Sequence, residues 1–87
     1  MFTLLFVEDD ESIRTALRLA LEDEGYSVIE AEDGESGISL FNQESPDLVL
    51  LDLRLPDISG FEVCRALRRT SIVPIIMVTA QTDTSDL

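Results

Sequence analysis

The chain has 87 residues, a hydrophobic fraction of 45% and a net charge of −12. This length allows one domain with a modest core. The charge arises from 18 acidic residues against 6 arginines, without any lysine. A surface this acidic repels phosphate backbones, so we expect no direct binding of nucleic acid. The apolar runs are far shorter than the roughly 20 residues that cross a bilayer, no basic flank precedes them, and a lone cysteine forms no internal disulfide, so we expect a cytoplasmic protein that does not enter the membrane.

The first third of the chain predicts a strand, a helix and a second strand. Residues 2–7 are apolar and end abruptly in four acids, which is typical of a buried strand with carboxylates at its carboxyl end. Apolar residues then recur at helical spacing as far as Gly25, which is a suitable stop. Asp10 can cap the start of this helix, and it can equally act as a ligand beside the neighbouring acids. Residues 26–31 predict the second strand.

The middle of the chain predicts a second helix and a third strand. Asp33 and Gly34 form a turn or cap before the helix. Gly34 and Gly37 weaken this helix prediction, because glycine disfavours a helix interior. Residues 47–53 are almost entirely apolar and predict a buried strand, with Asp52 as the one carboxylate near its end.

The last third predicts a loop, a third helix and a fourth strand. Proline, aspartate, serine and glycine at 56–60 indicate the loop, and the helix follows from Phe61. Cys64 is best interpreted as a packed residue of this helix and not as a reactive thiol. Residues 74–79 predict the strand, and 82–84 offer caps for a further helix. Three arginines near the end of the third helix suit its negative pole: Arg65, Arg68 and Arg69.

This alternation of elements predicts the fold class. Continuous apolar strands that alternate with amphipathic helices predict an α/β fold, in which helices cover both faces of a parallel sheet. The chain shows no internal repeat, low-complexity tract or linker, so residues 1–87 are expected to belong to one domain. The acids at 22–24 and 30–33 are interpreted as solvated surface.

Polar side chains follow three of the predicted strands. Glu8 and Asp9 follow the first, Asp52 ends the third, and Thr79 ends the fourth. Because ligands of open α/β sheets bind at the carboxyl ends of the strands, we expect these groups to meet there. Two carboxylates about 5 Å apart repel each other by roughly 3 kcal/mol, so three require a cation. Oxygen ligands without histidine favour Mg²⁺ or Mn²⁺, and a carboxylate beside such an ion can accept a phosphoryl group.

Three stretches of this sequence resemble the response regulator receiver domain of two-component signalling. They read FVEDDES after the first strand, LVLLDLRLPDISGFEV around the third and IIMVTA on the fourth. They occur in the order and at the spacing of the family, and the resemblance covers the whole chain. It implies a flavodoxin-like doubly wound parallel sheet with strand order 2-1-3-4-5.

The resemblance also implies roles for individual residues. Asp52 corresponds to the phosphoacceptor, whose donor is a histidine of a sensor histidine kinase. Asp9 corresponds to a direct Mg²⁺ ligand and Glu8 to one that acts through water, while the backbone carbonyl of Arg54 completes the metal site. Thr79 corresponds to the switch residue that hydrogen-bonds a phosphoryl oxygen. The remaining implied positions are Ala80, which leaves room for the phosphoryl group; Pro56 and Gly60, which shape the loop; and the side chains of Arg54 and Gln81, which tune phosphoryl lifetime, although an arginine such as Arg54 more often simply faces solvent.

The departure of the sequence from the family is large. Receiver domains carry a lysine after a fifth strand, and this chain has no lysine. We therefore expect the N-terminal part of a single receiver domain, truncated after the fourth strand, with about four strands and three helices. The missing parts would include the fifth strand, the last helix and a C-terminal output domain. The fourth strand would then be an exposed, uncharged edge, so we expect self-association or exchange of elements between copies.

These features leave competing functions. The first is a phosphorylatable, non-enzymatic switch that regulates transcription through an output domain. The alternative is a phosphorylation-incompetent receiver fragment that serves as an interaction or assembly piece. An aspartyl phosphohydrolase is disfavoured, because such enzymes usually carry an acid where this chain has Arg54. A nucleotide-binding domain is disfavoured too, because the first strand leads into acids and not into a glycine-rich phosphate loop.

Overall fold

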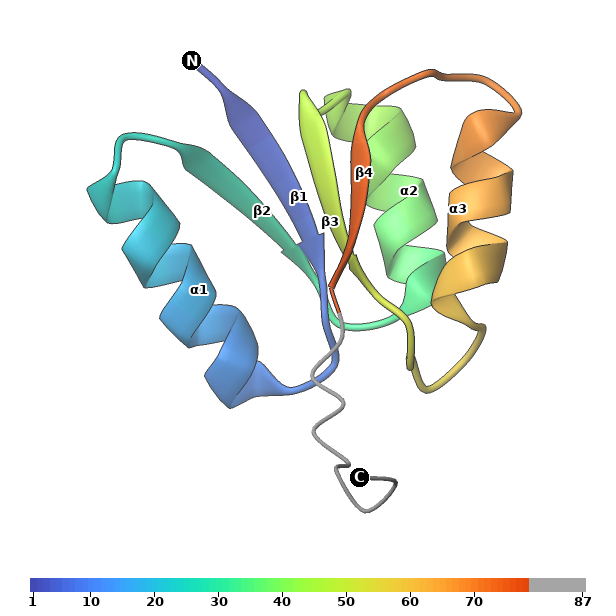
Figure 1. The fold of residues 1–87 in the computed structure, drawn as a ribbon, viewed down its shortest axis with the longest axis horizontal. Coiled ribbons are helices and arrows are strands. Elements are labelled where there is room, and N and C mark those ends of the chain that lie inside the picture. The colour runs from blue at the N-terminus through green and yellow to red at the C-terminus, as the bar shows by residue number, and fades with distance from the viewer. Residues whose placement is uncertain (79–87) are drawn as a thin grey trace, which may run out of the picture.

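Four parallel strands form one sheet in the computed structural model, which describes residues 1–78 (Figure 1). The strand order is β2-β1-β3-β4, which agrees with the order that the resemblance implied. The predicted alternation of strands and helices is confirmed throughout the described residues. The elements are β1 Thr3–Val7, α1 Glu11–Asp23, β2 Ser27–Ala31, α2 Gly34–Glu44, β3 Leu48–Asp52, α3 Gly60–Arg68 and β4 Ile75–Val78.

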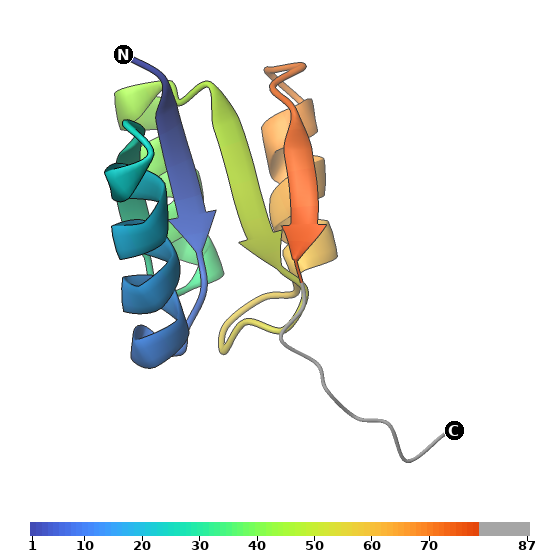
Figure 2. The ribbon, with the colours of Figure 1, turned by 60° about the vertical axis from the view of Figure 1, so that its left-hand side comes forward.

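Helices cover the two faces of the sheet unequally. Helix α1 lies on one face, and α2 and α3 lie side by side on the other (Figures 1 and 2). The register of β1 against β3 pairs Leu5 with Val49 and Val7 with Leu51, so these side chains share the face below α2 and α3. Nine buried residues form the core there: Leu5, Val7, Ala31, Phe41, Val49, Leu51, Val63, Leu67 and Val73.

Each helix begins at a side-chain cap. Asp10 accepts a hydrogen bond from the Ile13 amide at 3.1 Å, which satisfies one of the free amides of the first turn of α1. Of the two interpretations left open for Asp10, the cap is therefore the one that the structure supports. Asp33 caps α2 and Ser59 caps α3 in the same way. The predicted starts of all three helices are confirmed to within one residue.

Helix α2 is complete from Gly34 to Glu44, although its glycines weakened the prediction. The reason is close packing. A Cβ atom at Gly34 would lie 2.5 Å from the side chain of Ile58, and one at Gly37 would lie 2.9 Å from Val7. Glycine therefore costs α2 some intrinsic helix stability, and in return α2 packs directly against β1 and the loop before α3.

The strands are shorter than the apolar runs predicted. Tyr26, Asp47 and Leu53 fall outside the strands, and β4 begins after Pro74. Asp47 instead ties down the start of β1, because its carboxylate accepts a hydrogen bond from the Thr3 amide at 2.7 Å. The predictions for Thr79, Ala80, Gln81 and the cap at 82–84 lie outside the described residues.

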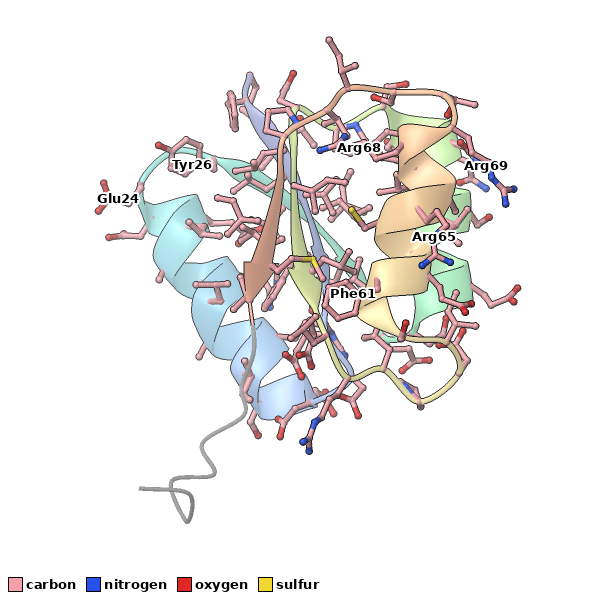
Figure 3. The ribbon with its side chains drawn as sticks, turned by 45° about the vertical axis from the view of Figure 1, so that its right-hand side comes forward. Glu24, Tyr26, Phe61, Arg65, Arg68 and Arg69 are labelled. Atoms are coloured by element: carbon pink, nitrogen blue, oxygen red, sulfur yellow. The ribbon has the colours of Figure 1, made fainter. Side chains whose placement is uncertain are left out.

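Helix α3 carries the three arginines expected near its end. Arg68 turns toward the loop that leads into β4 and donates to the carbonyl of Val73, whereas Arg65 and Arg69 project outward (Figure 3). Arg68 thus donates a hydrogen bond to a carbonyl beyond the helix, and it also places a positive charge near the negative pole of α3. Cys64 is partly buried and packs against the core, as predicted.

The face of the sheet beside α1 is only partly covered. An apolar hollow of about 400 Å³ lies there, lined by Phe2, Leu4, Leu21, Tyr26, Leu48 and Leu50. Strand β4 pairs with β3 and with no other described strand, and half of the surface of Ile76 is exposed. Residues 1–78 contain no helix with the length and apolar character needed to cross a membrane.

Candidate functional site

Three carboxylates meet where β1 and β3 end. Glu8 and Asp9 follow β1 directly, and Asp52 is the last residue of β3. Because the two strands are parallel neighbours, their carboxyl ends lie together, and the three residues each offer an oxygen within 4.8 Å of the others. Glu8 is only 2% exposed to solvent and Asp52 only 4%, whereas Asp9 is exposed. The predicted gathering of these acids is confirmed.

This arrangement is electrostatically strained. The pKa of Glu8 is raised from its ordinary value of 4.5 to about 7, mainly by burial, and the nearby charge of Asp52 and hydrogen bonds with Asp9 and Asp52 contribute to the rise. A hydrogen bond from the Asp10 amide, at 3.0 Å, acts in the opposite direction. The pocket therefore favours either a proton on Glu8 or a cation among the three acids.

The ligand chemistry fits a hard divalent cation. All the candidate side-chain ligands are carboxylate oxygens, and within residues 1–78 the ion pairs of the arginines go to Glu22 and Glu30 and leave these three acids without a basic partner. The Arg54 amide donates to one Asp52 oxygen at 3.3 Å, and the carboxylate keeps further lone pairs with which it can bind a cation. Mg²⁺ and Mn²⁺ prefer such oxygen ligands, so the residues present suit either ion.

The loop between β3 and α3 forms the other wall of the site. It carries Arg54, whose side chain is exposed. Hydrogen bonds hold the loop in two places. The Gly60 amide donates to the Leu53 carbonyl at 2.9 Å. Asp57 accepts the amides of Gly34 and Glu35 at 2.8 and 2.9 Å, and these hydrogen bonds lower the pKa of its carboxyl group. The loop is therefore fastened to the start of α2.

The sequence matches the family model of the response regulator receiver domain over residues 4–87. The chain belongs to the response regulator receiver domain family. Receiver domains are signalling modules, so the match supports a signalling role and not that of an ordinary enzyme. The parallel four-stranded sheet and the acid cluster agree with this membership.

Curated relatives of this receiver domain are longer proteins. The transcriptional regulatory protein AfsQ1 of Streptomyces coelicolor is 51% identical over 87 residues, which are 100% of this chain and 39% of that protein. The DNA-binding response regulator MtrA of Mycolicibacterium smegmatis is 45% identical over 84 residues, which are 97% of this chain and 37% of that protein. The chain thus spans less than two fifths of the length of these two relatives.

Solved structures show the same receiver fold. The response regulator TrrA of Thermotoga maritima, in complex with Mg²⁺ and BeF, has a TM-score of 0.88 and 39% identity, and the match covers 100% of this chain and 77% of that one. The chemotaxis protein CheY4 of Vibrio cholerae has a TM-score of 0.89 and 32% identity, and the match covers 99% of this chain and 74% of that one. The flavodoxin-like fold class predicted from sequence is confirmed.

The sequence did not predict that two residues, Arg14 and Glu30, lie close to the site. Arg14 contacts the backbone behind Glu8 and Asp9, and Glu30 pairs with it. The interpretation of residues 30–33 as solvated surface is wrong for Glu30, which pairs with two arginines of α1, whereas the interpretation of Asp33 as a turn or cap is confirmed. One signal was present: an arginine in the first turn of a helix opposes the helix dipole, so it needs another reason to be there.

Proposed function

We propose that this chain is a phosphorylatable receiver module of a two-component response regulator, with Asp52 as the phosphoacceptor. The observation that supports this most directly is the close set of three carboxylates, in which Asp52 lies at the end of the central strand β3. Asp52 is nearly buried, and the Arg54 amide occupies only one lone pair of its carboxylate, so the carboxylate can still act as an acceptor. In the sheet Asp52 pairs with Val78 of β4, and Leu51 before it pairs with Val7 of β1.

The proposed reaction transfers a phosphoryl group between two side chains. The phosphorus–nitrogen bond of a phosphohistidine breaks, an Asp52 carboxylate oxygen forms a bond to phosphorus, and the histidine nitrogen leaves with the electron pair and takes up a proton. Glu8, Asp9, Asp52 and the backbone carbonyl of Arg54 are proposed to hold Mg²⁺ or Mn²⁺. When bound, such an ion neutralises charge on the transferring phosphoryl oxygens. Of these residues, Glu8 and Asp9 would otherwise repel the incoming anion.

The remaining site residues keep the roles that the family resemblance implies. Thr79 would hydrogen-bond a phosphoryl oxygen, and Ala80 would leave space for the group. Arg54 and Gln81 would tune how long the acyl phosphate lasts. The exposed side chain of Arg54 agrees with a position at the rim, where an attacking water would approach.

Intact-mass measurement tests the proposal. The chain is incubated with Mg²⁺ and a small-molecule phosphodonor, with Asp52→Asn as the matched variant. We expect a phosphoryl adduct on the parent, none on Asp52→Asn, and none on the parent when a chelator removes the metal. An adduct that persists in Asp52→Asn would place the acceptor elsewhere. Absence of an adduct on a folded parent would favour the alternative, in which the chain is an interaction or assembly piece without phosphoryl chemistry.

The partners follow from the family. We propose a sensor histidine kinase as the phosphoryl donor in the cytoplasm, and a C-terminal output domain as the target of the switch. The two curated relatives named above are a transcriptional regulatory protein and a DNA-binding response regulator, which supports an output in transcription. The acidic charge of −12 supports a division of labour in which the receiver itself does not bind DNA.

We further propose that copies of this 87-residue chain associate through β4. Within residues 1–78, β4 has a sheet partner on one side only, and its four residues are all uncharged. An unpaired apolar edge is a template for another strand, and a second copy offers the same edge in a two-fold arrangement.

Light scattering on a size-exclusion column tests the association. We expect the parent chain to elute as a dimer or larger species at about 50 μM, and Ile76→Lys to elute mainly as a monomer, because a charge on the edge opposes strand pairing. Ile72→Lys is the matched control, since Ile72 is 95% exposed and lies in the loop before β4. A parent that is monomeric and unfolds cooperatively at this concentration would contradict the proposal.

A further inference from the structure

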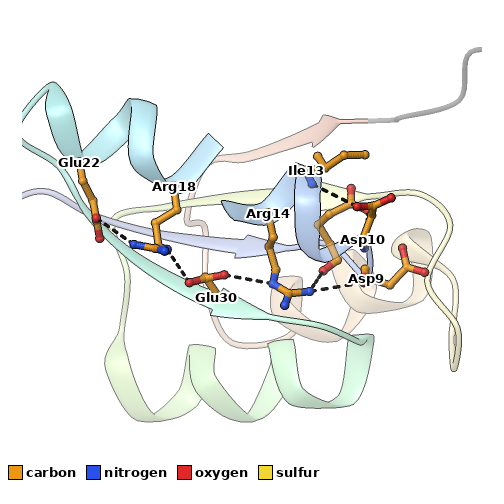
Figure 4. A network of polar contacts seen from close by, with 8 residues as sticks. Asp9, Asp10, Ile13, Arg14, Arg18, Glu22 and Glu30 are labelled. Atoms are coloured by element: carbon orange, nitrogen blue, oxygen red, sulfur yellow. Dashed lines mark hydrogen bonds and ion pairs between the residues drawn. The ribbon is translucent and has the colours of Figure 1, made fainter. Parts of the chain in front are cut away.

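The guanidinium of Arg14 links three parts of the fold behind the acid cluster (Figure 4). From the first turn of α1, its Nη1 donates to the Glu8 carbonyl at 2.8 Å and to the Asp9 carbonyl at 3.4 Å. Its Nε donates to the Glu30 carboxylate on β2 at 3.1 Å. The side chain is only 13% exposed, so these contacts replace water around most of the guanidinium.

These contacts hold the two peptide groups on either side of Asp9. The Glu8 amide is already fixed by the Ala31 carbonyl at 2.9 Å. Because the Glu8 carbonyl is fixed as well, the side chain of Glu8 can point in only one direction from the backbone. The hydrogen bond to the Asp9 carbonyl restricts the direction of the Asp9 side chain in the same way. A turn outside regular structure depends on such contacts, because it has no regular backbone ladder to set these directions, and the Asp10 amide adds one more contact to the Glu8 carboxylate. Glu30 in turn neutralises the guanidinium and fixes its plane.

We infer that Arg14 is a positioning residue that holds Glu8 and Asp9 in the arrangement that binds a divalent cation. This inference rests on the proposed cation site, and it assigns the contribution of Arg14 to geometry. The guanidinium touches backbone carbonyls and touches none of the three carboxylates that would bind the ion. It acts on the ligands through the chain that carries them.

A role in geometry and a role in charge predict opposite results. If Arg14 mattered only as a positive charge near the site, its removal would strengthen the binding of a divalent cation, because like charges repel. If Arg14 positions the ligands, its removal weakens the binding of the cation, because Glu8 and Asp9 are no longer held in the geometry that binds it. The sign of the change in affinity therefore decides between the two.

Arg18 supplies a matched control. It lies one turn further along α1, and its Nε forms an ion pair with the same Glu30 carboxylate at 2.7 Å (Figure 4). It also pairs with Glu22 at 3.1 Å. Within residues 1–78, Arg18 donates no hydrogen bond to the backbone of Glu8 or Asp9. Arg18→Met removes the same charge from the same helix and the same acid, and leaves the carbonyls of Glu8 and Asp9 bound by Arg14.

The test measures Mn²⁺ affinity of the full chain by the electron paramagnetic resonance of the free ion, with Mg²⁺ as competitor. We expect Arg14→Met to weaken binding by about 10-fold or more and Arg18→Met to change it by less than about 2-fold. Arg14→Lys keeps the charge, but one ammonium group cannot replace a guanidinium that contacts both carbonyls and Glu30. We therefore expect this variant to bind Mn²⁺ about 3-fold to 10-fold more weakly than the parent. Circular dichroism establishes that each variant is folded, and Arg14→Lys carries the test if Arg14→Met does not fold.

Hydrogen exchange of the metal-free chain gives a second readout. We expect the Asp9 and Asp10 amides to exchange faster in the Arg14 variants than in Arg18→Met at equal global stability. Binding by an Arg14 variant that equals or exceeds that of the parent overturns the inference and leaves the proposed cation site intact. A folded parent that binds no Mn²⁺ overturns the proposed site itself, and the inference with it.

Discussion

Replacement of Asp52 by asparagine is expected to stabilise the metal-free protein, by about 1–2 kcal/mol near pH 8. Buried residues at the end of a central strand usually cost stability when changed. Asp52 differs because it stands within 4.8 Å of Glu8 and Asp9 without a basic partner. Asparagine keeps the size and the amide hydrogen bond from Arg54, and it removes the charge that Glu8 faces. Urea unfolding in the presence of a chelator measures the difference.

The gain should depend on pH in a defined direction. The pKa of Glu8 is about 7 in the folded protein against 4.5 for a free side chain, so between these values the folded state binds more protons than the unfolded state. Stability therefore falls as the pH rises from about 4.5 to about 7. The full shift would correspond to at most about 3 kcal/mol, and solvent at the open rim reduces it. In Asp52→Asn this fall in stability with pH should be smaller, because the variant lacks the Asp52 charge that contributes to the raised pKa of Glu8.

Magnesium should reverse the order of the two proteins. An ion that binds only the folded state adds about 2.7 kcal/mol at a concentration 100 times its dissociation constant. We expect the parent to gain this stabilisation and Asp52→Asn to lose most of it. Asp23→Asn is the control for net charge, because Asp23 is exposed at the end of α1, far along the chain from the site, and it should shift stability by only a few tenths of a kcal/mol. An equal gain in Asp23→Asn would show that net charge, and not the acid cluster, sets the effect.

The sequence predicted those parts of the fold that local patterns determine. Apolar runs located the four strands, and side chains such as Asp10, Asp33 and Ser59 mark where helices begin. The meeting of Glu8, Asp9 and Asp52 was predicted correctly because each stands at the end of a strand, and parallel strands bring such ends together. The strand order was available only through the family resemblance, since no local pattern says that β1 lies between β2 and β3.

The sequence did not predict features that depend on distances between elements. Gly34 and Gly37 were interpreted as weak points of a helix, because propensity describes one residue and not the side chain of Val7 or Ile58 that approaches it. Glu30 was interpreted as surface, although it occupies a strand whose other residues are mostly apolar. Its partners on α1 lie 12 and 16 positions earlier in the chain, beyond the reach of any short motif.

Replacement of Gly60 by alanine is expected to destabilise the protein by about 3 kcal/mol. A Cβ atom at this position would lie 2.3 Å from the backbone oxygen of Asp52 and 2.9 Å from the Cα atom of Leu53. Both are backbone atoms, so no side chain can rotate away to make room. Either the start of α3 or the end of β3 must move, and the hydrogen bond from the Gly60 amide to the Leu53 carbonyl is strained in both cases. Urea unfolding measures the loss.

Gly25→Ala separates this collision from the general cost of replacing glycine. Gly25 has a φ of +97° and no neighbouring atom within 4 Å of the added Cβ, so its replacement should cost only the backbone strain, about 1 kcal/mol. The two variants should also differ in chemistry. The atom that an alanine at position 60 displaces belongs to Asp52, the proposed phosphoacceptor, so Gly60→Ala should lose most of the phosphoryl adduct under conditions where it is still folded, whereas Gly25→Ala should keep it. Equal adduct in both variants would mean that Asp52 tolerates a shift of its own peptide group, and that the tight contact between α3 and β3 serves stability alone.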